Sequence, residues 1–119
     1  MSELIGSELD DVAGGRVGRV AGFYLDAANR EPVWLVVALG RRGKKTVVVP
    51  IRECAAGAGR TWTAQEAKRM QAAPAVDPSR PLLREHELTI CGHYGIGERV
   101  GRHAEVAARA EGEITAQPA

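Results

Sequence analysis

Apolar and polar positions alternate in short blocks through the first half of the chain, and turn-forming residues separate the blocks. Between Gly14 and Pro50, three blocks are rich in β-branched and aromatic residues, with glycine, proline, asparagine and charged residues between them. Blocks of this kind predict paired β-strands. The three expected strands end at Asp26, Leu39 and Val49. We expect a further strand over residues 4–12 and a short one around Arg60–Trp62, after a loop over residues 55–59.

The block Val33–Leu39 is apolar at every position instead of alternating. A strand that is apolar on both faces has to be covered twice. We expect the core to cover one face, and either a helix or a second subunit to cover the other.

Glycines recur inside the strand that ends at Asp26, at Gly18 and Gly22. Interior glycines permit strong coiling or close backbone approach, as in a small barrel. Gly15 and Gly18 superficially resemble a phosphate-binding loop, but such a loop leads into a helix, and these glycines lead into a strand. We therefore reject nucleotide binding at this position.

Helical signals follow the strands. Thr63 and Glu66 have the spacing of a capping box, which predicts a short helix that ends near Met70, because prolines follow. A second helix is predicted over Arg84–Tyr94, stopped by Gly95. Its barrel-facing stripe is expected to contain Leu83, Ile90, Cys91 and Tyr94, with Leu88 at the edge.

The composition fits one domain in residues 1–96, followed by a tail in residues 97–119 that is rich in Ala, Glu and Arg. We expect the tail to be flexible or marginally helical, with any helix over residues 99–111. The formal net charge of +1 argues against wholesale electrostatic capture of nucleic acid or of an anionic membrane. The N-terminus lacks the features of a signal peptide, and no apolar run could cross a bilayer. We expect a cytoplasmic protein that does not insert into membranes.

Taken in order, several short motifs resemble the PRC-barrel family, the small β-barrel found in the H subunit of photosynthetic reaction centres, in the ribosome maturation factor and in many stand-alone prokaryotic proteins. Each motif is short, but their order and spacing are specific, and the resemblance covers about residues 4–96. The motifs are Leu4-Ile5-Gly6, Gly15–Val20, Tyr24-Leu25-Asp26, Val33–Val37, Val48–Ile51, Ala73-Pro74 and His93–Ile96.

The resemblance implies a mainly β fold: a small barrel of about six strands with one or two short C-terminal helices. It also implies a domain that is often dimeric and that has no catalytic residues and no cofactor. The reaction-centre relative has a transmembrane helix ahead of its barrel, and the ribosomal factor has another folded domain there. We find neither in this sequence, so we do not expect either function to carry over.

The candidate chemical groups favour structural roles. His86 and His93 are seven residues apart and would share a helix face, but Cys91 would point elsewhere and no HExxH motif is present, so we expect no metal site. A nucleophilic role for Cys54 or Cys91 would need a neighbouring base, which the sequence does not place there. Inert thiols in a reducing compartment are the simpler interpretation.

We therefore expect a non-enzymatic protein-interaction or scaffold module that forms a homodimer and binds an unidentified protein partner. The alternative is an RNA- or ribosome-associated accessory factor that uses the basic turn over residues 41–45. Trp62 could be a core anchor or an interface residue, and the sequence does not separate the two. The candidate interaction surface consists of Trp34, Arg41, Arg42, Lys44, Lys45 and Trp62.

Overall fold

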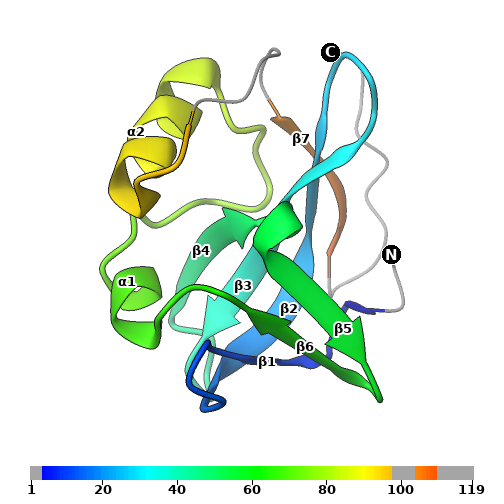
Figure 1. Ribbon diagram of the computed structural model, residues 1–119. Coiled ribbons are helices and arrows are strands. Elements are labelled where there is room, and N and C mark those ends of the chain that lie inside the picture. Colours follow the sequence, from blue (N-terminus) through cyan, green and yellow to red (C-terminus); the bar gives the residue numbers. More distant parts are fainter. Residues whose placement is uncertain (1–3, 98–103, 110–119) are drawn as a thin grey trace.

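The computed structural model describes residues 4–97 and 104–109, the latter as backbone only. One twisted sheet carries two short helices on one side (Figure 1). The elements, in chain order, are β1 (Glu8–Asp10), β2 (Arg16–Asp26), β3 (Pro32–Leu39), β4 (Lys45–Pro50), the 3₁₀ turn η2 (Ile51–Glu53), β5 (Cys54–Gly57), β6 (Arg60–Thr63), α1 (Ala67–Gln71), α2 (Arg84–Tyr94) and β7 (Ala104–Arg109).

The sheet has the strand order β4-β3-β2-β1-β6-β5, and β7 pairs with β2 off this path. Neighbouring strands are antiparallel except β1 and β6, which are parallel. The prediction of a mainly β fold with two short helices is confirmed. Among the described residues β4 and β5 do not pair with each other, so the backbone ladder does not close.

Strand β2 is the longest strand and the centre of the fold. One edge of β2 pairs with β3, and its other partners are β1 over its first half and β7 over its second half. Its register with β3 shifts between Val20 and Gly22 and again between Tyr24 and Leu25. Register shifts of this kind bend a strand and increase its twist, which agrees with the coiling that the glycines predict.

Strand β3 is buried on both faces, as its apolar pattern predicts. Leu35 and Val37 lie opposite Val49 and Val47 of β4 and share the inner face of the sheet. Trp34 and Val36 lie on the opposite face, where the indole of Trp34 is hydrogen-bonded to Glu87 of α2. The second cover of β3 is therefore the helical layer of the same chain, and this strand gives no independent support for a second subunit.

Helix α2 has the predicted bounds, and Gly95 ends it in the left-handed conformation at φ 67°. Ile90, Cys91 and Tyr94 are buried as predicted, but the stripe is wrong at Leu83, which is 45% exposed. Leu83 fits the helical spacing by sequence, but it is the extended residue before the helix, so its side chain does not continue the buried face. The position that completes the buried face is Glu87, which is 1% exposed.

The capping-box prediction for the first helix is wrong. Helix α1 begins after Glu66, which makes no side-chain capping hydrogen bond. Thr63 is the last residue of β6, where pairing with Cys54 holds it in the sheet. Its hydroxyl accepts a hydrogen bond from the amide of Gln65 at 3.3 Å and so stabilises the turn before the helix.

Three further segments differ from the prediction. The first strand is limited to β1, because the chain before it makes a turn. The expected loop over residues 55–59 contains strand β5, which pairs with β6 through a turn at Ala58 and Gly59. In the expected tail, the described residues form strand β7 and not a helix, because they add to the free part of the β2 edge. The rest of the tail lies outside the described residues, and the domain boundary after Ile96 stays a prediction.

Candidate interaction surface

The structure separates the six residues that the sequence places on one surface. Trp34 is 2% exposed, so the prediction that it contributes to a surface is wrong. Its indole Nε1 donates a hydrogen bond to Oε2 of Glu87 at 2.6 Å, which fixes α2 against the face of β3 that carries Trp34. An apolar strand covered by a helix has no free face at this position.

The basic turn between β3 and β4 is at the surface as predicted. Arg41, Arg42 and Lys44 are exposed. Lys45 differs, because it begins β4 and its Nζ donates a hydrogen bond to the carbonyl of Gln71 at 2.7 Å. Lys45 therefore links the turn to the end of α1, and three cations remain exposed.

Trp62 is 44% exposed on the outer face of the β5–β6 hairpin. Its neighbours Thr61 and Thr63 are buried, so the alternation along β6 directs the indole outward. A Cβ atom added at Gly57 would lie 3.7 Å from Cη2 of the indole, so the ring extends across the hairpin toward β5. No described contact joins Trp62 to the basic turn.

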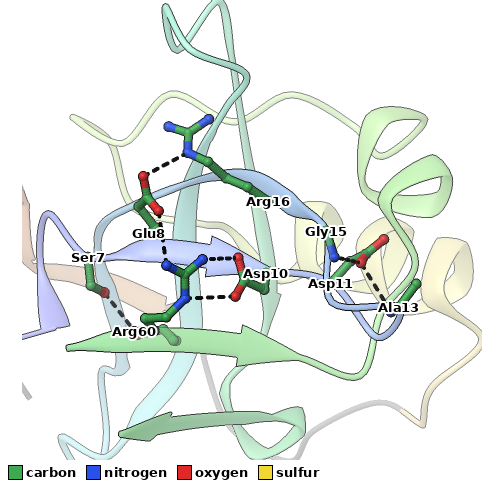
Figure 2. Close-up of polar contacts among 9 residues, drawn as sticks. Ser7, Glu8, Asp10, Asp11, Ala13, Gly15, Arg16 and Arg60 are labelled. Carbon is green, nitrogen blue, oxygen red and sulfur yellow. Dashed lines mark hydrogen bonds and ion pairs between the residues drawn. The ribbon is translucent and has the colours of Figure 1, made fainter. Parts of the chain in front are cut away.

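An ion-pair cluster of Glu8, Asp10, Arg16 and Arg60 is drawn in Figure 2. It lies beside Trp62, because Asp10 is opposite Trp62 where β1 pairs with β6. The guanidinium of Arg60 holds both oxygens of Asp10, with Nη2 to Oδ1 at 2.7 Å and Nε to Oδ2 at 3.0 Å. Its Nη1 lies 3.3 Å from Oε2 of Glu8, and Nε of Arg16 lies 3.2 Å from the other oxygen of Glu8. The cluster therefore joins three strands through alternating charges.

The hydrogen bonds from Arg60 lower the pKa of Asp10, and Asp10 in turn raises the pKa of Arg60. Both groups stay charged at neutral pH. Because exposed ion pairs contribute little stability, the cluster mainly orients the side chains of this face. Sequence reasoning missed the cluster, since β1 and β6 meet in parallel although about fifty residues separate them.

The turn before β2 is fixed by Asp11. Its Oδ1 accepts hydrogen bonds from the amides of Ala13 at 3.1 Å and Gly15 at 2.9 Å (Figure 2). Its Oδ2 accepts a hydrogen bond from the amide of Ala67 at the start of α1. Asp11 therefore holds the β1–β2 turn against the start of α1, which gives this carboxylate a structural role.

Comparison with known families adds to this geometry. The family model of the PRC-barrel domain matches residues 1–63, more than half of the chain. The chain belongs to the PRC-barrel domain family. The matched segment contains all strands from β1 to β6 and therefore the whole outer face around Trp62. No curated protein matches the sequence.

The PRC-barrel fold does not bring the described cysteines and histidines together as a metal site or a nucleophile with its base. Cys91 is buried and His86 is exposed, whereas Nε2 of His93 lies 2.6 Å from the carbonyl oxygen of Arg69. Within residues 4–97, no group of three or more His, Cys, Asp or Glu side chains could hold a metal ion. Burial raises the pKa of the Cys54 thiol to about 11, so this thiol is protonated at neutral pH.

A small cavity of about 130 Å³ lies where the ends of β3 and β4 meet the end of α2. Its lining is mostly apolar and includes Pro32, Trp34, Pro50 and Cys91.

In the part of the chain that the structure describes, no helix is long and apolar enough to span a bilayer. The cytoplasmic location expected from the sequence stays a prediction.

Proposed function

We propose that this PRC-barrel protein is a non-catalytic interaction module that forms homodimers and binds a partner protein through the outer face around Trp62. The observation that carries the proposal is the exposed indole of Trp62, fixed on a short strand beside oriented charged side chains. Tryptophan and arginine are the residues that most often dominate binding energy at protein interfaces. A rigid aromatic side chain also loses little conformational entropy on binding.

The absence of a catalytic role is part of the proposal. The thiol of Cys54 is protonated at neutral pH, which does not suit a nucleophile. The ionised side chains near Trp62 pair with one another, as expected for groups that orient a surface. A scaffold that presents side chains without transforming a ligand agrees with this arrangement.

The test compares binding by the wild type with binding by Trp62→Ala. Partners are captured from the native source with the full chain, and the recovered proteins are quantified by mass spectrometry. We expect Trp62→Ala to reduce specific recovery at least tenfold, which is the loss expected for removal of an interface anchor. Circular dichroism checks that the variant remains folded.

Leu88→Ala provides the matched control, because Leu88 is 39% exposed but lies on α2, in the helical layer. The control is expected to recover the same proteins as the wild type. Equal recovery by Trp62→Ala and the wild type would show that Trp62 is not the contact, and would remove the main support for the proposal.

A second candidate function is RNA binding through the basic turn. The supporting observation is that Arg41, Arg42 and Lys44 are exposed and make no ion pair with another described residue. Three phosphate contacts to single-stranded RNA predict a slope of about −2 for the logarithm of the binding constant against the logarithm of the salt concentration.

Fluorescence anisotropy with a labelled single-stranded RNA measures this slope. Charge reversal of Arg41, Arg42 and Lys44 is expected to abolish binding at 50 mM salt, whereas Trp62→Ala should leave it unchanged. No binding by the wild type at low salt would exclude this function.

A further inference from the structure

The two edges of the sheet are protected very differently. At the β4 edge, the carbonyl of Thr46 accepts a hydrogen bond from the amide of Val76 at 2.9 Å, and that of Val48 accepts one from the hydroxyl of Tyr94 at 2.7 Å. The segment around α1 and α2 therefore covers this edge. At the other end of the sheet, β5 pairs only with β6 among the described residues.

The geometry of the β5–β6 hairpin shows which backbone groups are free. Ala58 and Gly59 have φ values of 52° and 77°, as in a two-residue hairpin turn, and Gly57 and Arg60 close it. The closing pair exchanges both hydrogen bonds, so the next pair, Ala56 and Thr61, does not. The amide and carbonyl of Ala56 therefore point away from β6, toward the open edge.

The composition of β5 leaves this edge unprotected. Natural edge strands carry lysine, proline or bulges that prevent pairing with other chains. The strand Cys54–Gly57 has the sequence Cys-Ala-Ala-Gly, without charge or proline, and its pairing with β6 is regular. Its small side chains present no steric barrier to an added strand.

We propose that β5 pairs with β5 of a second copy of this chain, in antiparallel orientation, to form a continuous sheet across a two-fold axis at Ala56. This inference rests on the homodimer in the proposed function and names its interface. Ala56 offers one donor and one acceptor on the same side, so the Ala56 residues of two copies satisfy each other's backbone groups. Such self-complementarity is the defining property of a two-fold interface.

The side chains beside the β5 edge also favour a second copy of this chain as its partner. With Ala56 on the axis, Ala55 of each copy lies opposite Gly57 of the other, on the outer face. The Trp62 ring of each copy already extends toward Gly57, so the two rings flank a strip of small residues. Arg60 is paired with Asp10 and Glu8, so the approach of two copies brings no uncompensated charge from this residue together.

The expected dimer is weak. A four-residue edge and one exposed indole per copy form an interface below the standard size. We expect a Kd between about 10 µM and 1 mM. Sedimentation equilibrium of the full 119-residue chain over this concentration range measures it.

The decisive variant is Ala56→Pro, which removes the free amide and leaves the hydrogen bonds between β5 and β6 in place. It is expected to weaken dimerisation at least tenfold. Ala75→Pro is the matched control, because Ala75 is exposed in the loop after α1 and its amide donates no hydrogen bond to another described residue. The control should dimerise within twofold of the wild type.

A cross-linking experiment keeps the proposal testable if Ala56→Pro fails to fold. In a hydrogen-bonded antiparallel pair the Cα atoms lie about 5.5 Å apart, within the range for a disulfide. In a Cys54→Ala, Cys91→Ala background, Ala56→Cys is expected to form a covalent dimer under mild oxidation. Ala28→Cys, in the exposed β2–β3 turn, should remain largely monomeric.

The outcomes separate this inference from the proposed function. A wild-type chain that is monomeric at 1 mM overturns the homodimer and this interface with it, and leaves the binding role of Trp62 to its own test. A dimer that Ala56→Pro does not weaken, or equal cross-linking of both cysteine variants, overturns the β5 interface alone. If β5 pairs instead with an extended segment of another protein, the purified chain alone is expected to be monomeric.

Discussion

Replacing Trp34 with alanine is expected to lower the free energy of unfolding by about 3–5 kcal/mol, the usual cost of deleting a large buried aromatic side chain. Trp34 packs between β3 and α2, and its indole donates the 2.6 Å hydrogen bond to Glu87. The substitution therefore opens a cavity and also removes a hydrogen bond from a buried carboxylate, which adds a desolvation cost. Because native proteins have only about 5–15 kcal/mol of stability, the variant should lose a large part of it.

Urea denaturation followed by circular dichroism measures this loss. Trp62→Ala is the matched control, since it deletes the same side chain from an exposed position and should cost less than about 1 kcal/mol. Similar destabilisation by the two substitutions would contradict the assignment of Trp34 to the core and Trp62 to the surface.

Replacing Gly18 with alanine is expected to destabilise the fold by about 3 kcal/mol or more, at the upper end of the costs of overpacking. A Cβ atom at this position would lie 2.1 Å from the carbonyl oxygen of Ala38 and 3.0 Å from its carbonyl carbon. Both atoms belong to the backbone of β3, so no side-chain rotation can relieve the clash. The strands β2 and β3 would have to separate where Gly18 pairs with Leu39.

Gly92→Ala provides the contrasting control. Gly92 lies inside α2, and a Cβ atom there would meet nothing within 4 Å. Because alanine favours the helix by about 1 kcal/mol relative to glycine, this variant should be stabilised. Thermal unfolding of the two variants measures the difference, and a Gly18→Ala protein as stable as the wild type would refute the close approach of β2 and β3.

Local patterns predict the parts of this fold that local physics determines. The blocks of β-branched residues predict β2, β3 and β4, and the combination of amphipathic spacing with Gly95 predicts α2. Strand β5 has an alanine- and glycine-rich sequence with low strand propensity, and it is a strand only because it pairs with β6. The sequence of such a strand does not predict that it is a strand.

The candidate site depends still more on distant pairing. Trp34 and Trp62 are both tryptophans on strands, and the position of α2 over Trp34 makes it part of the core while Trp62 is at the surface. Arg60 and Asp10 meet because β1 and β6 run parallel, a contact that no local spacing predicts. The basic turn at residues 41–44 was predictable, because turns between strands are usually exposed.

The helical layer has a consequence for where this protein can be divided. The segment that matches the family model ends at Thr63, but the buried Trp34 is hydrogen-bonded to Glu87 of α2, which follows it. Val36 and Val48 are buried on the same face of the sheet as Trp34. A fragment that ends at Thr63 would expose these side chains to solvent as one apolar patch, which would favour aggregation. The cooperative folding unit therefore extends at least to Tyr94, whose hydroxyl is bonded to the β4 edge.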